Sequence, residues 1–426
     1  IPWVVFAIPF ALLGASPLRR RLLSGPLLNR FRLEMPGISD TERQALDAGD
    51  IGWEKTLFSG KPRWRRWFKS PCPSLSAEER AFIEGPVERL CEILDEHDIN
   101  SGLKDLPALA WEHMKKERFF GLTIRPEDGG LGFSEYAHGA IVMKIATRSL
   151  VGALTVMIPN SVGPAELIRK YGTSAQRRNW LPRLARGDEI PCFALTGPEA
   201  GSDASAIPDI GVVCRAPYAG KEDVLGIRLT FDKRYITLAP VATLIALAFR
   251  LHDPDGLLGG DEWPGISIVL LPADTPGVDK GARHAPLHMG FQNGPLSGRD
   301  VFVPADALIG GPGRAGQGWK MLMECLSGGR AISLPALSVA TAKLACRATG
   351  AYARIRYQFG RPIGAFEGVK EALAQIAGNT YAMNAARIMT LGTIQAGASP
   401  ALVGAMIKYN LTERCRRVVT DAMDVH

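Results

Sequence analysis

The chain has 426 residues, 46% of them apolar and 22% charged, and a formal net charge of +7. This length predicts about two to four domains of ~100–200 residues, and the composition excludes a disordered tail, a collagen-like repeat and a disulfide-stapled miniprotein. Residues 1–70 hold 12 Lys/Arg against 6 Asp/Glu, so nearly all of the net charge lies there. Because neutralising phosphates takes cations along a whole binding face, we expect no nucleic-acid partner.

The first 18 residues are apolar and uncharged, and Arg19, Arg20 and Arg21 follow at once. A helix of that length spans roughly 27 Å, slightly less than a hydrocarbon core of about 30 Å. As the last part of a spanning helix it would place the arginines, and the chain that follows, on the cytoplasmic side of a membrane. A buried core segment and a signal-peptide remnant are the alternatives, and the second fits less well because the charge follows the apolar run.

Residues 61–69 interleave five cations with three aromatic side chains. Trp at the headgroup level and Lys/Arg near anionic lipid are typical of a segment that lies on a membrane surface. The alternative is a solvated loop whose tryptophans dock on the domain, and the sequence leaves both open.

Cysteine and histidine give no sign of a metal or disulfide framework. The seven cysteines include no C-x-x-C pair, and the seven histidines show no H-E-x-x-H or other ligand set. An odd cysteine count argues against complete disulfide pairing, and no metal site is predicted.

From about residue 76 the chain reads as helices, then strands, then helices. Ser76 and Glu79 form a capping box ahead of an apolar run with helical spacing. Past residue 187, short β-rich runs are separated by Gly, Pro and Asp, and from residue 317 long helical patterns return. This order predicts an α+β fold in segregated blocks rather than an alternating βαβ sheet. The predicted helices are 76–94, 107–118, 136–149, 163–171, 174–181, 317–326, 330–358, 368–396 and 400–423, and the predicted strands are 191–195, 211–214, 226–230, 241–249, 265–271 and 300–303.

Residues 311–316 match the dinucleotide pattern G-x-G-x-x-G. A Rossmann site needs that pattern inside a βαβ unit, with an acidic residue about 20 positions further on, whereas this segment leads into helices. We interpret it as a flexible loop before a helix.

Three further motifs are each ambiguous alone. Residues 193–203 (FALTGPEAGSD) offer hydroxyls, backbone N–H groups and a glycine for close approach, which suits an anionic or heteroaromatic ligand but also an ordinary turn. Residues 233–237 (KRYIT) place an aromatic ring beside a hydroxyl, either against a planar cofactor or on a half-buried strand. Residues 354–360 (RIRYQFG) put cations at a helix C-terminus, where they favour the helix dipole whatever the function.

Together and in this order, these motifs resemble the acyl-CoA dehydrogenase family over about residues 76–426. Within that family the chain is most similar to the large membrane-associated bacterial fatty-acyl-CoA dehydrogenases of β-oxidation. The runs that carry the closer likeness are 181–187 (LPRLARG), 190–203 (IPCFALTGPEAGSD), 233–240 (KRYITLAP), 291–295 (FQNGP) and 422–424 (AMD), together with the basic, apolar N-terminal segment.

The resemblance implies an N-terminal helical domain, a middle β domain and a C-terminal helical bundle, here truncated. The expected boundaries are a membrane-associated segment at 1–70, the helical domain at 71–187, the β domain at 188–309 and the incomplete bundle at 310–426. FAD would lie between the β domain and the bundle, partly against a neighbouring subunit of a homo-oligomer.

The resemblance also implies the residues that hold FAD. Phe193, Leu195 and Thr196 would line the flavin ring, and Gly201 and Ser202 would face its ligand side. Two departures from the family pattern affect these contacts, because Gly197 and Glu199 replace the usual acidic and Gly residues and Tyr235 replaces the usual Trp. The remaining expected contacts are Tyr235, Ile236 and Thr237 near the reactive nitrogen, and Arg356, Gln358 and Phe359 at the FAD of the partner subunit.

The chemistry that the resemblance implies is α,β-desaturation of long-chain fatty acyl-CoA thioesters, with an electron-transfer flavoprotein as acceptor. Most of the family uses a Glu beyond a Gly-Gly motif as the base, and here that motif would follow residue 426. Other members place the base before an Arg on the long helix, but that position is Gly329, and Glu324 does not match it. Ser202 and Arg330 are the candidate substrate contacts.

We therefore expect the catalytic base beyond residue 426, and we expect residues 1–426 to desaturate poorly or not at all. Two alternatives from other functional classes stay open. One is a membrane-bound flavoprotein that binds acyl-CoA without turning it over, and the other is a membrane-attached interaction module without FAD.

Overall fold

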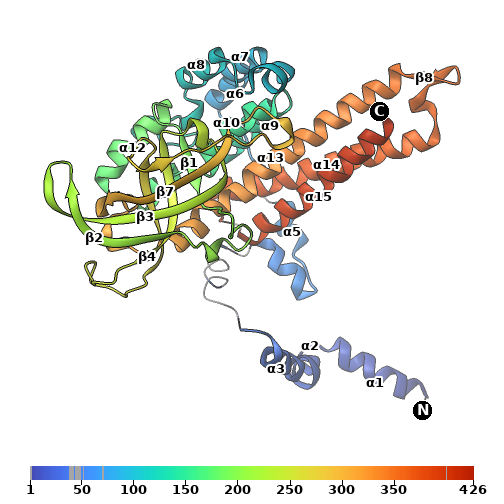
Figure 1. The fold of residues 1–426 in the computed structure, drawn as a ribbon. Helices are drawn as coiled ribbons and strands as arrows, with labels where there is room; N and C mark the ends of the chain where they lie inside the picture. The colour runs from blue at the N-terminus through green and yellow to red at the C-terminus, as the bar shows by residue number, and fades with distance from the viewer. Residues whose placement is uncertain (1, 38–42, 44–48, 51, 70–71, 400) are drawn as a thin grey trace. The chain divides into compact units, whose positions relative to one another are not determined.

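The computed structural model describes residues 2–37, 43, 49, 50, 52–69, 72–399 and 401–426 (Figure 1). It divides into two units, Ile1–Arg43 and Gln44–His426. The first unit is helical, and its described side chains are nearly all exposed, including Trp3, Phe6 and Phe10. Its helices are α1 (Pro2–Gly14), α2 (Ser16–Arg19), a π-helical turn (Arg20–Ser24) and α3 (Gly25–Glu34).

Two stretches of the described chain have the length and apolarity of a membrane span. One is the bent pair Pro2–Ala11 and Ser16–Glu34, with an angle of 76° between its halves. The other, Leu150–Tyr171, is 61% buried inside the second unit and is a core helix pair of the domain. Length and apolarity therefore do not distinguish a span from a core helix in this chain.

The second unit begins with short helices around one apolar core. The predicted capping box is confirmed, since Ser76 Oγ accepts from the Glu79 N–H and Glu79 accepts from the Ser76 N–H. Helix α10 was not predicted, because its sequence is apolar on every face and shows no amphipathic period. The helices are α5 (Trp64–Phe68), α6 (Ala77–Glu84), α7 (Pro86–Ile93), α8 (Ala108–Lys116), α9 (Glu135–Ala146), α10 (Leu150–Ser161), α11 (Ala165–Tyr171) and α12 (Ser174–Arg186).

A single sheet of seven strands forms the middle of the unit, in the order β1-β4-β2-β3-β7-β6 with β5 paired to β4. Strand β4 is buried along most of its length, which is why it reads as a continuous apolar run rather than an alternating one. The β3–β7 pairing is irregular between Lys233 and Ile236. The strands are β1 (Pro191–Ala194), β2 (Ile210–Tyr218), β3 (Lys221–Thr237), β4 (Leu244–His252), β5 (Gly265–Pro272), β6 (Val278–Asp279) and β7 (Asn293–Pro304).

Three long helices, α13 (Gly318–Ile355), α14 (Glu367–Gln395) and α15 (Ala401–Val425), pack side by side (Figure 1). The short hairpin of β8 (Tyr357–Gln358) and β9 (Arg361–Pro362) joins the first two. The predicted break between 326 and 330 is wrong, because α13 continues through it. A Cβ at Gly329 would lie 3.1 Å from the Ser161 carbonyl oxygen, so this glycine marks a close helix contact and not a helix end. The α+β class and the order of its blocks are confirmed.

Candidate functional site

The motifs at 193–203 and 233–237 meet at one edge of the sheet. The Arg234 N–H donates to the Thr196 carbonyl oxygen at 2.9 Å, which ties the end of β1 to the end of β3. A Cβ on Gly197 would lie 2.9 Å from the Asp232 carbonyl oxygen, so the two segments are in close contact. Two sequence motifs 40 residues apart thus form one surface.

A buried ion pair in the domain interior supports this surface. The Lys233 ammonium lies 2.5 Å from Asp209 Oδ2, and both side chains are at most 1% exposed. Lys233 also donates to the Leu195 carbonyl oxygen at 2.9 Å, and Asp209 Oδ1 accepts from the Asp232 N–H at 2.8 Å. Burial lowers the pKa of Lys233, and the Asp209 carboxylate opposes that shift. One ion pair therefore fixes both segments of the surface.

Tyr235 is exposed and conformationally strained. Its φ is +59°, a left-handed conformation that costs a non-glycine residue about 1–2 kcal/mol and persists where the surroundings impose it. Asn293 Nδ2 donates to the Tyr235 carbonyl oxygen at 3.0 Å and to Thr237 Oγ1 at 3.3 Å, which holds the strained backbone. The Tyr235 ring is 57% exposed and packs at 4.9 Å from the His284 ring. An aromatic ring is thus presented to solvent on a rigid backbone.

The other predicted contacts of this surface divide into two kinds. Phe193, Leu195 and Thr196 are half-buried, and Gly201 and Ser202 are exposed. A Cβ at Gly201 would meet nothing within 4 Å, so the backbone there is open to a ligand. Ile236 differs from the prediction, because its side chain is 3% exposed and belongs to the domain core. Only the backbone of Ile236 can face a bound ring.

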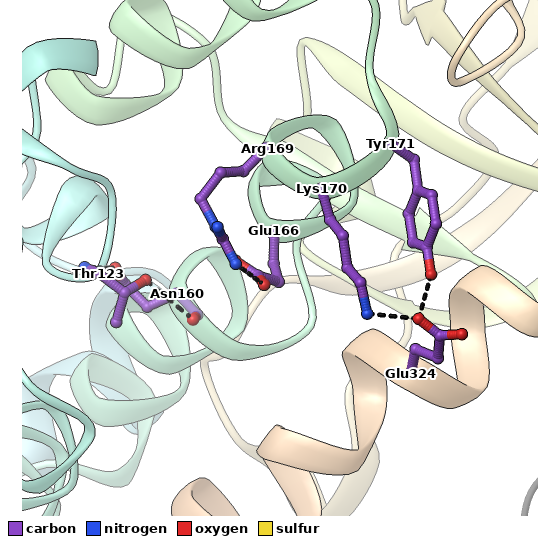
Figure 2. Close-up of polar contacts among 7 residues, drawn as sticks. All are labelled: Thr123, Asn160, Glu166, Arg169, Lys170, Tyr171 and Glu324. Atoms are coloured by element: carbon purple, nitrogen blue, oxygen red, sulfur yellow. Dashed lines mark hydrogen bonds and ion pairs between the residues drawn. The ribbon is translucent and has the colours of Figure 1, made fainter. Parts of the chain in front are cut away.

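A cavity of about 250 Å³ lies between α9, α10, α11 and the first half of α13. Figure 2 shows the polar contacts on its wall, with Glu324 of α13 facing Lys170 and Tyr171 of α11. Glu166 is paired with Arg169, and Thr123 Oγ1 donates to the Asn160 carbonyl oxygen at 3.3 Å. The side chain of Arg330, a predicted substrate contact, lies outside the described residues. The residues lining the cavity are Thr123, Glu135, His138, Asn160, Ser161, Glu166, Glu324, Cys325, Gly329, Ala331, Ile332, Ile394, Ala398 and Ser399.

Glu324 is poorly suited to remove a proton. Burial opposes its ionisation, but hydrogen bonds from Lys170 and Tyr171 outweigh that effect, and the pKa of the Glu324 carboxyl lies below its usual value. The same contact and its burial raise the pKa of Tyr171. A general base works best with a pKa near the working pH, and the lowered pKa of Glu324 moves away from that range.

His138 forms part of the buried wall of the cavity. The side chain is 1% exposed, and its Nε2 has no hydrogen-bond partner among the described residues. Burial lowers the pKa of His138 to about 4, so the imidazole is neutral at pH 7. A neutral ring can donate or accept a hydrogen bond without bringing a charge into the cavity.

The first turns of α13 connect the cavity to the sheet edge. Cys325 lines the cavity and also packs in the apolar cluster that contains Phe193 and Leu195. The cavity and the predicted ring-binding edge therefore border one apolar cluster. Among the described residues no group of three or more His, Cys, Asp or Glu side chains could hold a metal ion.

Arg356, Gln358 and Phe359 are not part of this arrangement. They lie beyond the C-terminal end of α13, and Phe359 is 93% exposed with φ +51°. The end of α13 at Ile355 is 30 residues beyond the cavity-lining Cys325, a length of about 45 Å at 1.5 Å per residue. These three residues cannot serve the flavin surface of their own chain.

Both helical blocks match known domains. The acyl-CoA dehydrogenase N-terminal domain matches residues 75–188, and the acyl-CoA dehydrogenase C-terminal domain matches residues 316–426. The chain belongs to the acyl-CoA dehydrogenase family. The probable acyl-CoA dehydrogenase FadE10 of Mycobacterium tuberculosis is 31% identical over 358 residues, which cover 82% of this chain and 52% of the relative.

Two further acyl-CoA dehydrogenases extend the comparison. The probable acyl-CoA dehydrogenase YngJ of Bacillus subtilis is 31% identical over 275 residues, which cover 64% of this chain and 67% of the relative. The crystal structure of acyl-CoA dehydrogenase from Geobacillus kaustophilus has a TM-score of 0.73 at 24% identity, covering 83% of this chain and 89% of that one, which shows a shared fold. The chain spans about half the length of the FadE10 proteins that it matches.

FAD is the cofactor of acyl-CoA dehydrogenases, and the described residues fit it. A flavin offers a planar apolar ring with polar edges. The sheet edge offers the exposed Tyr235 ring, the half-buried Phe193 ring, the Thr196 hydroxyl and an open backbone at Gly201. These residues would hold the ring, and Lys233 and Asn293 would hold them in place.

The sequence did not reveal the buried residues that support the sheet edge, nor the histidine in the cavity wall of this acyl-CoA dehydrogenase. Asp209 and His138 stand outside every motif, whereas Lys233 and Asn293 stand inside runs that resemble the family but were given no role. Lys233 gave no local signal, because it stands between Asp232 and Arg234 in a strand that carries further charged residues. The partner itself lies 24 residues away and could not be read from spacing.

Proposed function

We propose that this chain is the flavin- and substrate-binding part of an FAD-dependent acyl-CoA dehydrogenase that oxidises an acyl-CoA thioester between its α and β carbons. One observation carries the proposal. Cys325 of α13 lines the 250 Å³ cavity and packs against the same apolar cluster as Phe193 and Leu195 of the ring-binding edge. A substrate in the cavity would thus lie next to a cofactor at the sheet edge.

FAD, when bound, would accept the hydride that leaves the β-carbon. The chain's own residues supply position and exclusion of water. Phe193 and Tyr235 would contact the ring, and the hydroxyls of Thr196 and Thr237 would face its polar edge. Backbone donors near the thioester carbonyl would stabilise the enolate that develops as the α-proton leaves. The open backbone at Gly201 and Ser202 is our candidate for that role.

The base that takes the α-proton belongs to the same proposal. Gly329 has no side chain for it, and the Glu324 carboxylate is held by Lys170 and Tyr171. We infer that a Glu after a Gly-Gly motif, in the chain that follows residue 426, supplies the base, as the family resemblance implies. Residues 1–426 alone should then bind FAD and acyl-CoA but turn over poorly.

The substrate class, acceptor and location are proposals on the same footing. We infer long-chain fatty acyl-CoA of β-oxidation, an electron-transfer flavoprotein as acceptor, a homo-oligomer, and attachment to the cytoplasmic face of a bacterial inner membrane. The exposed apolar α1 and the arginines of residues 19–21 support the attachment. The exposed tip at Arg356–Phe359, which cannot reach its own flavin surface, supports the oligomer.

The test uses the protein extended to its natural C-terminus. We expect a yellow protein whose flavin absorption bleaches anaerobically on addition of palmitoyl-CoA, whereas residues 1–426 keep their colour unbleached. A coloured extended protein that no acyl-CoA bleaches would instead support the flavoprotein without turnover. A colourless protein that gains no absorption with added FAD would support the interaction module, and an extended chain without that Glu would overturn the dehydrogenase.

A further inference from the structure

Residues 52–69 form a module that we call the aromatic–basic hairpin. It consists of a 3-10 helix (Trp53–Ser59) and α5 (Trp64–Phe68). The rings of Trp53, Trp64 and Trp67 pack on one another with centroids 5.3–6.1 Å apart. Trp53 Nε1 donates to the Arg63 carbonyl oxygen at 2.9 Å, which closes the module. The tryptophans therefore give the hairpin a small core of its own.

The outer surface of the hairpin combines exposed aromatic rings with positive charge. Phe58 is 80% exposed, Phe68 is 76% exposed and Trp64 is 51% exposed. Residues 52–69 contain six Lys/Arg and one Glu. A hollow of about 460 Å³ along the 3-10 helix and the loop that follows it is lined by Lys55, Lys61 and Arg63 among others. Exposed apolar rings beside clustered cations are the combination that an anionic lipid surface stabilises.

The hairpin is tied at both ends to the turn that follows α14. The Asp50 N–H donates to the Ser399 carbonyl oxygen at 2.7 Å, and the Ser399 N–H donates to Asp50 Oδ2 at 3.3 Å. On the far side, Ser74 and Gln395 exchange two hydrogen bonds of 3.3 Å. Four hydrogen bonds thus connect the flanks of the hairpin to residues 395–399.

That same turn forms the rim of the cavity. Ala398 and Ser399 line the cavity and are exposed, whereas His138, Ala331 and Ile332 line it and are buried. The cavity therefore opens at residues 398–399, next to the attachment points of the hairpin. Glu135 and Glu166 are the other exposed lining residues, so the acidic part of the rim lies on α9 and α11.

We propose that the aromatic–basic hairpin lies on an anionic bilayer and holds the open rim of the cavity at the bilayer surface. An acyl chain could then pass from the lipid into the cavity without first crossing bulk water, which disfavours each exposed methylene group. The identity of this cargo rests on the proposed function, but the docking of the hairpin does not. The bilayer contact differs from an α1 anchor because it fixes the orientation of the second unit.

The test places one fluorescent label at a time on the full chain of residues 1–426. In a Cys72→Ser background, which removes the exposed cysteine, NBD is attached at Phe58→Cys, Ser399→Cys or Lys221→Cys. The vesicles contain phosphatidylcholine with 30% or no phosphatidylglycerol. We expect a strong blue shift and gain in emission at 58, a smaller one at 399 and none at 221, on the anionic vesicles only.

Charge variants supply the matched control. The double variant Lys61→Glu/Arg63→Glu should need about tenfold more lipid, or beyond, to give the same response at 58. The reason is that each cation near an anionic surface contributes to binding. Arg89→Glu/Lys116→Glu makes the same change of charge at exposed positions on α7 and α8 and should leave the response unchanged. Thermal unfolding of each variant confirms that it folds.

Three outcomes would overturn the proposal. These are vesicle flotation without a response at 58, an equal response at 221, and an equal loss in both charge variants. A response at 58 in a protein whose extended form fails to bleach with acyl-CoA would keep the docking and reject the proposed function. Bleaching by acyl-CoA without any response at 58 would keep the proposed function and reject the docking.

Discussion

The two regions that the family resemblance assigns to FAD are built in opposite ways. The segment from Lys233 to Thr237 is fixed by a buried ion pair and by two donors from Asn293, although Tyr235 itself is exposed. The hairpin with Phe359 is exposed along its whole length and projects beyond the end of α13. The first region is preorganised within its own chain. The second is held by the β8–β9 pairing and by a contact between the Phe359 and Phe366 rings, whose centroids are 6.0 Å apart, and it lies at the surface.

This contrast separates the stability of the chain from its capacity to bind a cofactor. A change beneath the sheet edge should alter both, because the buried groups fold the domain and position the ring contacts. A change at the β8–β9 hairpin should alter only FAD binding, and only in the assembled homo-oligomer. The following predictions test that separation.

The largest effect is expected for Lys233→Met. The change leaves the Asp209 carboxylate buried without a cation, which costs about 3–5 kcal/mol of unfolding free energy. The double variant Lys233→Met/Asp209→Leu removes both charges and should recover most of that loss. It still leaves the Leu195 carbonyl oxygen without its donor, so FAD affinity should stay reduced.

Urea unfolding and FAD titration of the two variants measure these quantities separately. A double variant with the stability of the parent and the FAD affinity of the parent would show that the pair is structural only. In that case the positioning role assigned to Lys233 is wrong.

A pH change probes the buried region without a mutation at the sheet edge. The pKa of His138 is lowered by burial from 6.5 to about 4, so below pH 6.5 the unfolded chain binds a proton that the folded chain does not. Unfolding free energy should therefore fall as the pH drops from 6.5 to 4, by about 3 kcal/mol in total. The His138→Gln variant lacks this titration, and its curve should be flatter across that window. Parallel curves for the two proteins would contradict the assignment.

Tyr235→Gly should have a smaller effect on stability, and of the opposite sign. Glycine adopts φ +59° without strain, which gains up to about 1 kcal/mol of unfolding free energy and is partly offset by backbone entropy. The loss of the exposed ring should weaken FAD binding severalfold. Tyr235→Trp, which restores the family's usual residue, serves as the control and should keep the binding.

Phe359→Ala should leave the unfolding free energy within about 0.5 kcal/mol of the parent, because the ring is 93% exposed. We expect FAD to dissociate faster from the assembled protein, as measured by the release of flavin fluorescence on dilution. Exposed Tyr381→Ala on α14 makes a matched loss of an aromatic ring. An equal effect of both changes on FAD dissociation would show that the β8–β9 hairpin has no specific role in holding FAD.

The sequence predicted the class of the fold and most of its elements because periodicity and turn residues are local. It predicted separate helices at 317–326 and 330–358 because Gly328 and Gly329 read as a break, whereas the close contact of Gly329 with Ser161 explains that glycine inside one helix. It missed α10 because a helix buried on every face shows no period.

For the candidate site too, the sequence revealed the local motifs but not the contacts between distant segments. Motifs placed Phe193, Thr196 and Tyr235 near a cofactor, but nothing local showed that the Ile236 side chain belongs to the core. The Lys233–Asp209 pair and the cavity around His138 depend on contacts between distant segments, which a single sequence does not record. Tertiary pairing of polar groups was the missing information.

The continuity of α13 has a consequence for genetics. One unbroken helix lines a cavity with its first turns and carries the hairpin of Phe359 at its other end. In the proposed homo-oligomer, each flavin site would combine the sheet edge of one chain with the hairpin of another. A mixed dimer of a chain defective at Tyr235 and a chain defective at Phe359 would then contain one intact site and one site with both defects. Two inactive alleles should therefore complement each other in one cell.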